Sequence, residues 1–333
     1  MSMTANINNY IPGFRKTAGL VKREILDQKT GFVTVPLVVA GLIALATVGN
    51  IFFSVEHFIG IASVHELSGF VDDEGRFLQD ILDSVDDDVI TTIIGGAALA
   101  LATPLLMIMP FVMINAILST LFDDRKDRSY LFFKSMPVSD THEVSTKLAT
   151  ILLGVPLITF AIAFALQIVV SLALSLYLLP TDLPVGALWT HMPIVAVWGP
   201  VFITMITYFL WAMPFIGWGI AVSAYAPKAP LMVAVVPLVA VSILEQVLFK
   251  SEYFAKWLLS YAGVHFGKTA VSVKEGSVGM VINELDDAKI NMLSASDAFE
   301  ILGKSLMQAD FWIGIAIGVA LIAAAIRGRK YNV

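Results

Sequence analysis

The residues that carry most enzyme chemistry form no complete motif in this chain. Gly267-Lys268-Thr269 and Gly303-Lys304-Ser305 resemble the end of a phosphate-binding loop. Such a loop needs another glycine five residues before the Gly-Lys pair, and it must follow a buried strand. The two required positions hold Ala262 and Ala298, and no strand-like run precedes either. We therefore expect that this chain does not hydrolyse ATP itself.

The patterns of metal-binding and nucleophilic residues are as weak as the two phosphate-loop matches. His57, His65 and Glu66 share an acidic stretch, but their spacing matches no metalloprotease motif. The chain has no cysteine, which excludes disulfides, thiolate catalysis and cysteine-based metal sites. No Ser/His/Asp set or paired carboxylates occur within the apolar runs. We expect no catalytic residue, no metal and no cofactor bound by this chain.

Polar side chains inside the apolar runs are the remaining candidates. Glu245 is the most expensive to bury, because an acid in a bilayer usually faces a cavity or a partner. It lies near Lys250, so a local structural pair is the alternative to a place on a substrate pathway. Asn115 and Gln167 are predicted to form hydrogen bonds between helices, with a place on the pathway as the alternative.

The composition predicts the environment of these residues. Hydrophobic residues make up 57% of the 333 residues and charged residues only 14%, whereas soluble domains carry about 25% charged residues. The mean hydropathy is +0.81. These values predict an all-α polytopic membrane protein, a single transmembrane domain over 1–333, surrounded by lipid and without a nucleic-acid partner.

Six apolar runs are long enough to cross a bilayer, which takes ~20 helical residues. The predicted spans are 33–55, 90–122, 147–179, 193–224, 231–249 and 310–326. The second, third and fourth are longer than a bilayer requires, so they must tilt, bend or project into water. We interpret the prolines within them as ordinary helix bends.

Lysine and arginine predict the orientation of the spans. Five precede the first span, five lie in the 123–147 stretch and three follow the last span. The 56–89 stretch has one arginine against ten acids, and 180–192 has neither lysine nor arginine. The positive-inside rule therefore predicts cytoplasmic termini, a cytoplasmic 123–146 loop, an acidic external 56–89 loop and an external or re-entrant 250–308 segment.

Amphipathic helices are also predicted outside the spans. Phe14, Ala18, Val21 and Ile25 recur at helical spacing among basic residues, which predicts an interfacial helix over 12–30 at the inner membrane surface. A second helix is predicted from about Ser296, at the end of the 250–308 segment.

The predicted loop between the second and third spans has an unusual composition. Four basic residues between 123 and 139 are accompanied by Tyr130, Leu131, Phe132 and Phe133, and the stretch closes with Pro137. A loop that only re-enters the bilayer does not need a block of aromatic residues. We therefore expect a short amphipathic helix that is pressed against a partner protein.

This loop resembles the cytoplasmic loop of type 2 ABC exporter permeases, in a divergent bacterial branch. That family combines an acidic and basic run, a Gly-Thr-Leu-Glu-like helix, a Pro-Val-Ser turn and a lysine ten residues after the proline. Arg128 stands at the usual glycine and Leu131 at the usual glutamate. The residues that fit the pattern are Asp124, Arg125, Asp127, Pro137, Val138, Ser139 and Lys147.

The resemblance implies a permease subunit of an ATP-driven exporter in the bacterial cytoplasmic (inner) membrane. It implies a dimer, with a homodimer as first choice and a heterodimer with a sister permease as second. Two separate ABC ATPase subunits would bind ATP and Mg²⁺, so this chain would not be an enzyme. The residues implied in ATPase coupling are Asp124, Arg125, Asp127, Arg128, Tyr130, Phe132, Phe133, Pro137 and Lys147.

The competing hypothesis is an ion-coupled secondary transporter or a channel without an ATPase partner. It requires coupling carboxylates or pore-lining charges within the spans, and Glu245 is the single deep acid. No internal repeat is evident, although many secondary transporters have one. A lipid, a peptide antibiotic, a small drug and a polysaccharide precursor all remain open as the substrate.

Overall fold

The computed structural model describes residues 12–53, 87–127, 139–179, 185–190, 192, 194–259, 261 and 295–331. This part of the chain is helical and contains no strand. Its helices are α2 (Pro12–Asp27), α3 (Val35–Phe53), α5 (Asp87–Lys126), α7 (Asp140–Ala149), α8 (Val155–Leu178), α9 (Val185–Thr190), α10 (Ile194–Trp211), α11 (Met213–Tyr225), α12 (Pro230–Phe249), α13 (Tyr253–Leu259), α15 (Ala295–Leu306) and α16 (Ala309–Tyr331). Short π-helical turns, η1 (Thr30–Thr34) and η2 (Thr150–Gly154), lead into α3 and α8.

Six helical stretches are long and apolar enough to cross a membrane, so the chain is a multi-pass membrane protein. They are Thr30–Phe52, Ile94–Lys126, Asp140–Leu178, Leu188–Trp211, Pro230–Phe249 and Ala309–Gly328. The number of spans and the places of five of them agree with the sequence prediction. The residues of the predicted 56–89 loop up to 86, and 262–294 of the predicted 250–308 segment, lie outside the described residues.

The structure divides the predicted fourth span, 193–224, into two helices. α10 ends at Trp211 and α11 begins at Met213, with Ala212 between them at φ −78° and ψ 0°. Pro214 supplies the physical reason, because its ring lacks the N–H that would donate to the carbonyl oxygen four residues earlier and clashes with that carbonyl. The interpretation of Pro214 as a bend within one helix is therefore wrong, whereas Pro104 and Pro110 lie inside the continuous helix α5.

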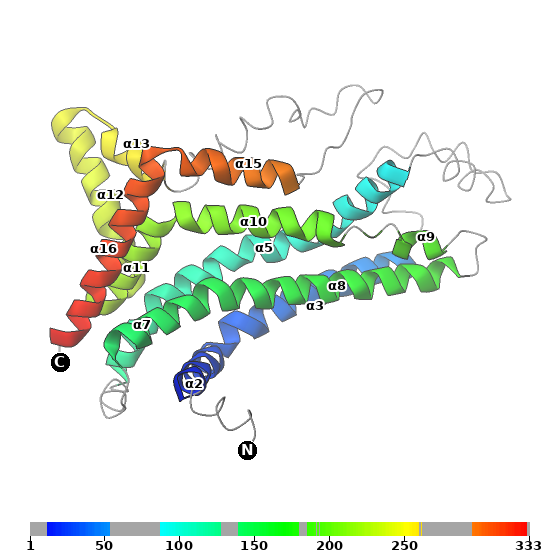
Figure 1. The fold of residues 1–333 in the computed structure, drawn as a ribbon, viewed down its shortest axis with the longest axis horizontal. Helices are drawn as coiled ribbons and strands as arrows, with labels where there is room; N and C mark the ends of the chain where they lie inside the picture. The colour runs from blue at the N-terminus through cyan, green and yellow to red at the C-terminus, as the bar shows by residue number, and fades with distance from the viewer. Residues whose placement is uncertain are drawn as a thin grey trace, which may run out of the picture.

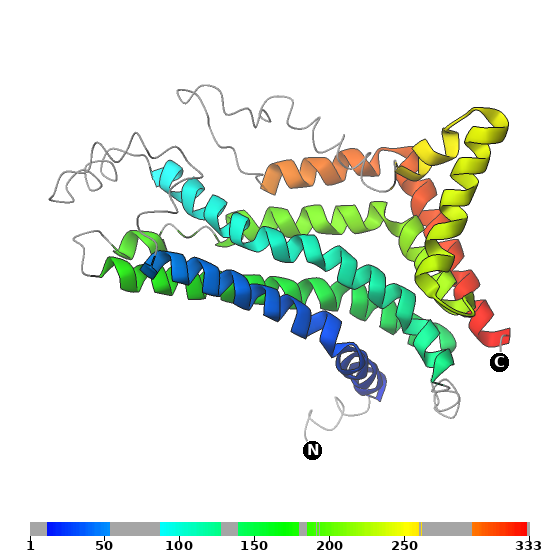
Figure 2. The same cartoon turned by 180° about the vertical axis from the view of Figure 1, so that it is seen from behind.

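The helices form two groups that run in different directions. α3, α5, α8 and α10 lie side by side as a layer of long rods, while α11, α12 and α16 cross one end of this layer steeply (Figure 1; from behind in Figure 2). The break at Ala212 is what takes the chain from one group into the other. The main core lies where the groups meet, and it includes Phe32, Met113, Ile117, Val144, Ile151, Val155, Ile216 and Ile220.

The helix predicted from about Ser296 is α15, which begins at Ala295. It lies along α10 (Figure 1) and buries Ala298 and Ile301. The indole N–H of Trp211 donates to Ser305 Oγ at 3.0 Å and fixes this packing. The end of the predicted external segment, α15, therefore packs closely on a span.

A buried aromatic group joins the end of α10 to the start of α16. Trp211, Tyr261 and Phe311 pack against one another, and the Tyr261 hydroxyl donates to the Asp310 carbonyl oxygen at 2.6 Å. Burial, together with the Asp310 carboxylate, raises the pKa of Tyr261 above its usual value. The phenol therefore stays protonated at neutral pH and keeps its role as a hydrogen-bond donor.

Candidate coupling site at the basic end of the helices

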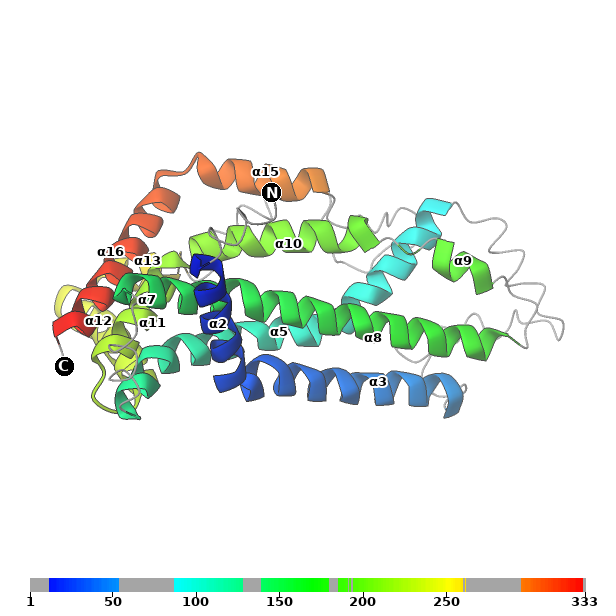
Figure 3. The same ribbon diagram turned by 60° about the horizontal axis from the view of Figure 1, so that its bottom comes forward.

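Several elements that carry lysine or arginine lie in the same half of the molecule. They include α2, the end of α5, α7, the turn before α12 and the end of α16, on the left in Figure 1. Figure 3 shows α2 lying across the layer near α7. This end contains a group of charges from three elements, the buried Glu24 and Asp124 and the half-buried Lys147, which we call the basal charge cluster.

Lys147 lies at the centre of the basal charge cluster. It stands on α7, whose first turn is capped by Ser139, which accepts a hydrogen bond from the His142 N–H at 3.2 Å. Its Nζ donates to Asp124 Oδ2 at 2.8 Å and to the Thr120 carbonyl oxygen at 3.2 Å. The same ammonium lies 3.4 Å from Glu24 Oε2. One lysine thus contacts both α5 and α2.

The two carboxylates reach Lys147 from different helices. Thr120 and Asp124 are four residues apart on α5 and so share one face of that helix. Glu24 comes from α2, where its Oε1 accepts hydrogen bonds from Thr120 Oγ1 at 2.9 Å and from Gln28 Nε2 at 3.0 Å. Glu24 is 5% exposed and Asp124 is 8% exposed. Buried charges of this kind are tolerated only when they are paired and hydrogen-bonded, as these are.

Arg125 joins the same end of α5 to α11. Its guanidinium donates to the carbonyl oxygens of Ser223 at 2.7 Å and Ala226 at 2.9 Å, at the end of α11. Ser223 Oγ in return accepts from the N–H groups of Leu121 and Phe122, at 2.9 and 3.1 Å. A cation is favourable here because the last carbonyls of a helix have no partner within it. The end of α5 is therefore bonded to α2 and α7 by Asp124 and its neighbours, and to α11 by Arg125.

The structure thus brings together three of the residues predicted for ATPase coupling, namely Asp124, Arg125 and Lys147. Asp127 is exposed just after α5 and lies outside the cluster. The other predicted coupling residues, Arg128, Tyr130, Phe132, Phe133 and Pro137, lie outside the described residues. What is described of the predicted loop is helical at both ends, because α5 continues to Lys126 and α7 begins at Asp140.

Sequence reasoning missed Glu24, Thr120 and Ser223. Glu24 directly precedes Ile25 of the apolar stripe of α2, and this position was the available signal. A charge at the edge of an apolar stripe is usually solvated, however, and its partner lies far away in the sequence. Thr120 and Ser223 give no signal at all, since hydroxyl side chains are common in apolar helices.

The three polar residues considered for a substrate pathway have different surroundings. Gln167 is buried and its Oε1 accepts from the indole N–H of Trp198 at 3.2 Å, which confirms the predicted bond between helices. Asn115 is exposed on α5, and its side chain makes no hydrogen bond to another described residue, so the predicted bond is not found within this part of the chain.

Glu245 binds the start of α13. Its Oε1 accepts from Ser251 Oγ at 2.8 Å and from the Tyr253 N–H at 2.9 Å, and its Oε2 accepts from the Phe254 N–H at 2.8 Å. Its partners are thus a hydroxyl and the free N–H groups of a helix terminus, in place of the predicted Lys250. This local arrangement supports the structural interpretation of Glu245.

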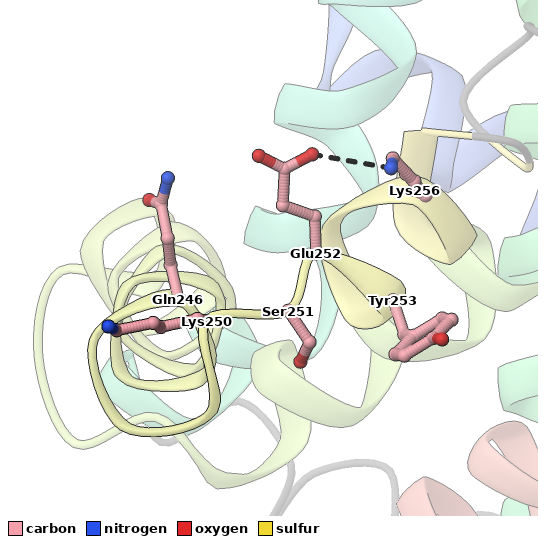
Figure 4. A pocket seen from close by; sticks show the side chains of 6 residues that line it. All are labelled: Gln246, Lys250, Ser251, Glu252, Tyr253 and Lys256. Atoms are coloured by element: carbon pink, nitrogen blue, oxygen red, sulfur yellow. Dashed lines mark ion pairs between the residues drawn. The ribbon is translucent and has the colours of Figure 1, made fainter.

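A surface cavity of about 540 Å³ lies beside this turn, and Glu245 is not among its lining residues. Lys250 and Lys256 point in different directions from its two sides, and Lys256 pairs with Glu252 at 3.4 Å (Figure 4). A ligand site needs polar groups that converge, which these do not.

The remaining motifs give no site in the described part of the chain. Gly303-Lys304-Ser305 lies near the end of α15, with Lys304 paired to Glu300 at 2.9 Å and Ser305 bonded within the helix. A phosphate loop stands at the start of a helix, so this match is spurious. No group of three or more possible metal ligands occurs among the described residues. His57, His65, Glu66 and Gly267-Lys268-Thr269 lie outside them.

A scan against protein-family models found no match, and neither did searches of curated proteins and of solved structures. The class of this protein therefore rests on its fold and its site alone. In the described part of the chain it is an all-helical, multi-pass membrane protein with a charge cluster at its basic end.

Proposed function

We propose that this chain is the permease subunit of an ATP-driven ABC exporter, and that it works as a dimer, first as a homodimer, with two separate ATPase subunits. The observation that carries the proposal is the basal charge cluster. It connects the last turn of α5 and, through Lys147, the helix α7 to the N-terminal helix α2, and α5 and α7 flank residues 128–138. Arg125 extends the connection to α11.

This arrangement gives an ATPase a route into the membrane helices. A partner that moves the predicted loop would move the adjoining ends of α5 and α7. Because the cluster and Arg125 bond those ends to α2 and α11, the displacement would reach both helix groups of the fold. The chain would then supply an element with two states, and ATP binding and hydrolysis on the partner would bias their populations.

The shared location of the basic helix ends supports the predicted orientation. We place α2, the predicted loop, the turn before α12 and the end of α16 on the cytoplasmic side of a bacterial inner membrane. Single cysteines at Ser84, Ser139 and Ser277 test this, since the chain has none of its own. A membrane-impermeant thiol reagent should label 84 and 277, but not 139, in intact cells. Labelling of 139 from outside would reverse the orientation.

The ion-coupled alternative needs acids deep in the spans. In the described spans the carboxylates lie near helix ends, at Asp123 and Asp124, Asp140 and Glu143, Glu245, and Asp310. This distribution of carboxylates favours transport that is driven by a partner ATPase over transport that is coupled to ions.

Co-purification from native cells decides between the two. The tagged chain, extracted in mild detergent, should bring with it an ABC ATPase that mass spectrometry identifies by its nucleotide-binding motifs. A transport-active chain that purifies without any ATPase would contradict the proposal and favour ion coupling.

The aromatic residues of the predicted loop should provide the anchors of that interaction. Truncating an anchor to alanine commonly costs ~2 kcal/mol or more, which is about 30-fold in affinity. Replacing Phe132 and Phe133 together by alanine should therefore reduce the recovered ATPase by that order. The matched control is Leu176→Ala with Leu179→Ala, two exposed apolar residues at the other end of α8. Equal recovery from both double variants would exclude the loop as the docking site.

A further inference from the structure

We propose that Glu24 attaches α2 to α5 and α7, as a positioning residue that holds the interfacial helix against these two helices. The consequence for transport rests on the function proposed above, whereas the attachment itself does not. Glu24 is the one charged side chain that is buried among the described side chains of α2. Its burial therefore marks the point at which α2 is attached.

The other described charges of α2 are not buried as Glu24 is. Lys22 is exposed. Arg23, which is half-buried, pairs with Asp27 at 3.1 Å, one turn away on the same helix. Exposed pairs of this kind contribute roughly 0.3–0.5 kcal/mol. A second polar contact, between Thr17 Oγ1 and His142 Nε2 at 3.2 Å, is exposed. Glu24 is thus the buried polar attachment of α2.

The geometry makes the Glu24 contact the one that can open first. Lys147 Nζ lies 2.8 Å from Asp124 but 3.4 Å from Glu24. If α2 separates, Lys147 keeps its bonds to Asp124 and to the Thr120 carbonyl oxygen, so no unpaired ammonium is left behind. A buried charge is strongly unfavourable when it is left uncompensated, and here Asp124 still compensates the ammonium. Lys147 can therefore release α2 while α5 and α7 stay joined.

This gives α2 two states, attached and released, with Glu24 as the group that distinguishes them. In the attached state α2 follows any displacement of the ends of α5 and α7. In the released state it lies on the membrane surface and does not move with the ends of α5 and α7. Because α2 carries basic residues and an apolar stripe, the membrane interface can accept it in both states.

The attachment is tested by distance measurement in the full chain. Cysteines at Lys22 on α2 and Ser145 on α7 are exposed and can carry spin labels. In lipid nanodiscs the wild-type background should give one narrow distance distribution. Glu24→Gln keeps an oxygen for Thr120 and Gln28 but presents an amide to the ammonium, so the distribution should broaden toward longer distances. Asp27→Asn, on the same helix, should leave it unchanged.

A second, milder variant tests the attachment in case Glu24→Gln does not fold. Thr120→Val is nearly isosteric and removes one hydrogen bond to Glu24, so it should broaden the distribution less than Glu24→Gln. A wild-type distribution in both variants would overturn the attachment.

The consequence for transport is tested with the ATPase complex in liposomes. The measured quantity is substrate moved per ATP hydrolysed, which a residue that serves stability alone would not change. Glu24→Gln should lower this ratio about fivefold or more, in the range of ordinary couplings between sites. Asp27→Asn should match the wild type. Released α2 with an unchanged ratio would overturn the role in coupling. If no ATPase accompanies the wild-type chain, the proposed function fails, while the distances still decide the attachment.

Discussion

Two helix contacts in this molecule are built in opposite ways. α11 and α16 touch through glycines: a Cβ atom at Gly217 would lie 2.5 Å from the Gly318 carbonyl oxygen, and one at Gly318 would overlap the Met213 carbonyl. α2 instead meets α5 and α7 through a buried ion pair and hydrogen bonds. The first contact is backbone against backbone, and the second is made by the tips of flexible side chains.

The difference between the two contacts indicates which helices can move relative to each other. Close backbone contact through small residues is how helices associate where lipid surrounds them, and separating the helices breaks many van der Waals contacts at once. An ion pair shared by three helices can lose one member and keep the others. We therefore expect α11 and α16 to move as one body, and α2 to be the part whose attachment changes.

The largest effect should come from removing the centre of the basal charge cluster. Lys147→Met removes the ammonium that contacts both Glu24 and Asp124. Removing one partner of a buried ion pair costs about 3–5 kcal/mol. We expect a marked drop in the thermal unfolding midpoint, or no monodisperse protein, by fluorescence-detected size-exclusion chromatography. Lys126→Met, an exposed residue on α5, is the control and should stay within ~0.5 kcal/mol. Equal behaviour of the two variants would mean that water reaches the cluster.

The α11–α16 contact should break with the addition of one methyl group. Gly318→Ala forces the two backbones apart, and overpacking of this kind costs about 1–3 kcal/mol. The control is Gly41→Ala on α3, where a Cβ meets nothing within 4 Å. That change should be neutral or slightly stabilising, because alanine favours helix over glycine by roughly 1 kcal/mol. The comparison fails if both variants unfold at the same temperature in detergent.

The smallest effect should follow from Glu245→Gln, whose partners all lie within nine residues of it. A glutamine can accept at one oxygen only, so the start of α13 should loosen. Faster hydrogen exchange at the amides of Tyr253 and Phe254 would show this, with an unchanged unfolding midpoint. Glu252→Gln, which affects only an exposed pair, is the control. Lost transport by a fully folded Glu245→Gln variant would instead place Glu245 on the substrate pathway.

Helix number, place and type were predictable from the sequence because they follow from local composition. A run of about 20 apolar residues in a bilayer must be helical, since no water is present to satisfy its backbone groups. The apolar stripe of α2 and the start of α15 are local patterns as well. Pro104 and Pro214 mark the limit of such reasoning: both lie in apolar runs, yet α5 continues through Pro104 while the chain turns before Pro214. Which proline ends a helix depends on what the next segment packs against.

The basal charge cluster was decided by tertiary structure alone. The sequence placed Lys147 at the start of a span and Asp124 at the end of another, and it showed the charges of α2 as a polar face. Glu24 and Lys147 meet only because the core around Phe32 and Val144 seats η1 and α7 against α5, which brings α2 alongside. A charge has no local signature of burial. Its state depends on distant side chains that exclude water around it, and that arrangement exists only in the folded chain.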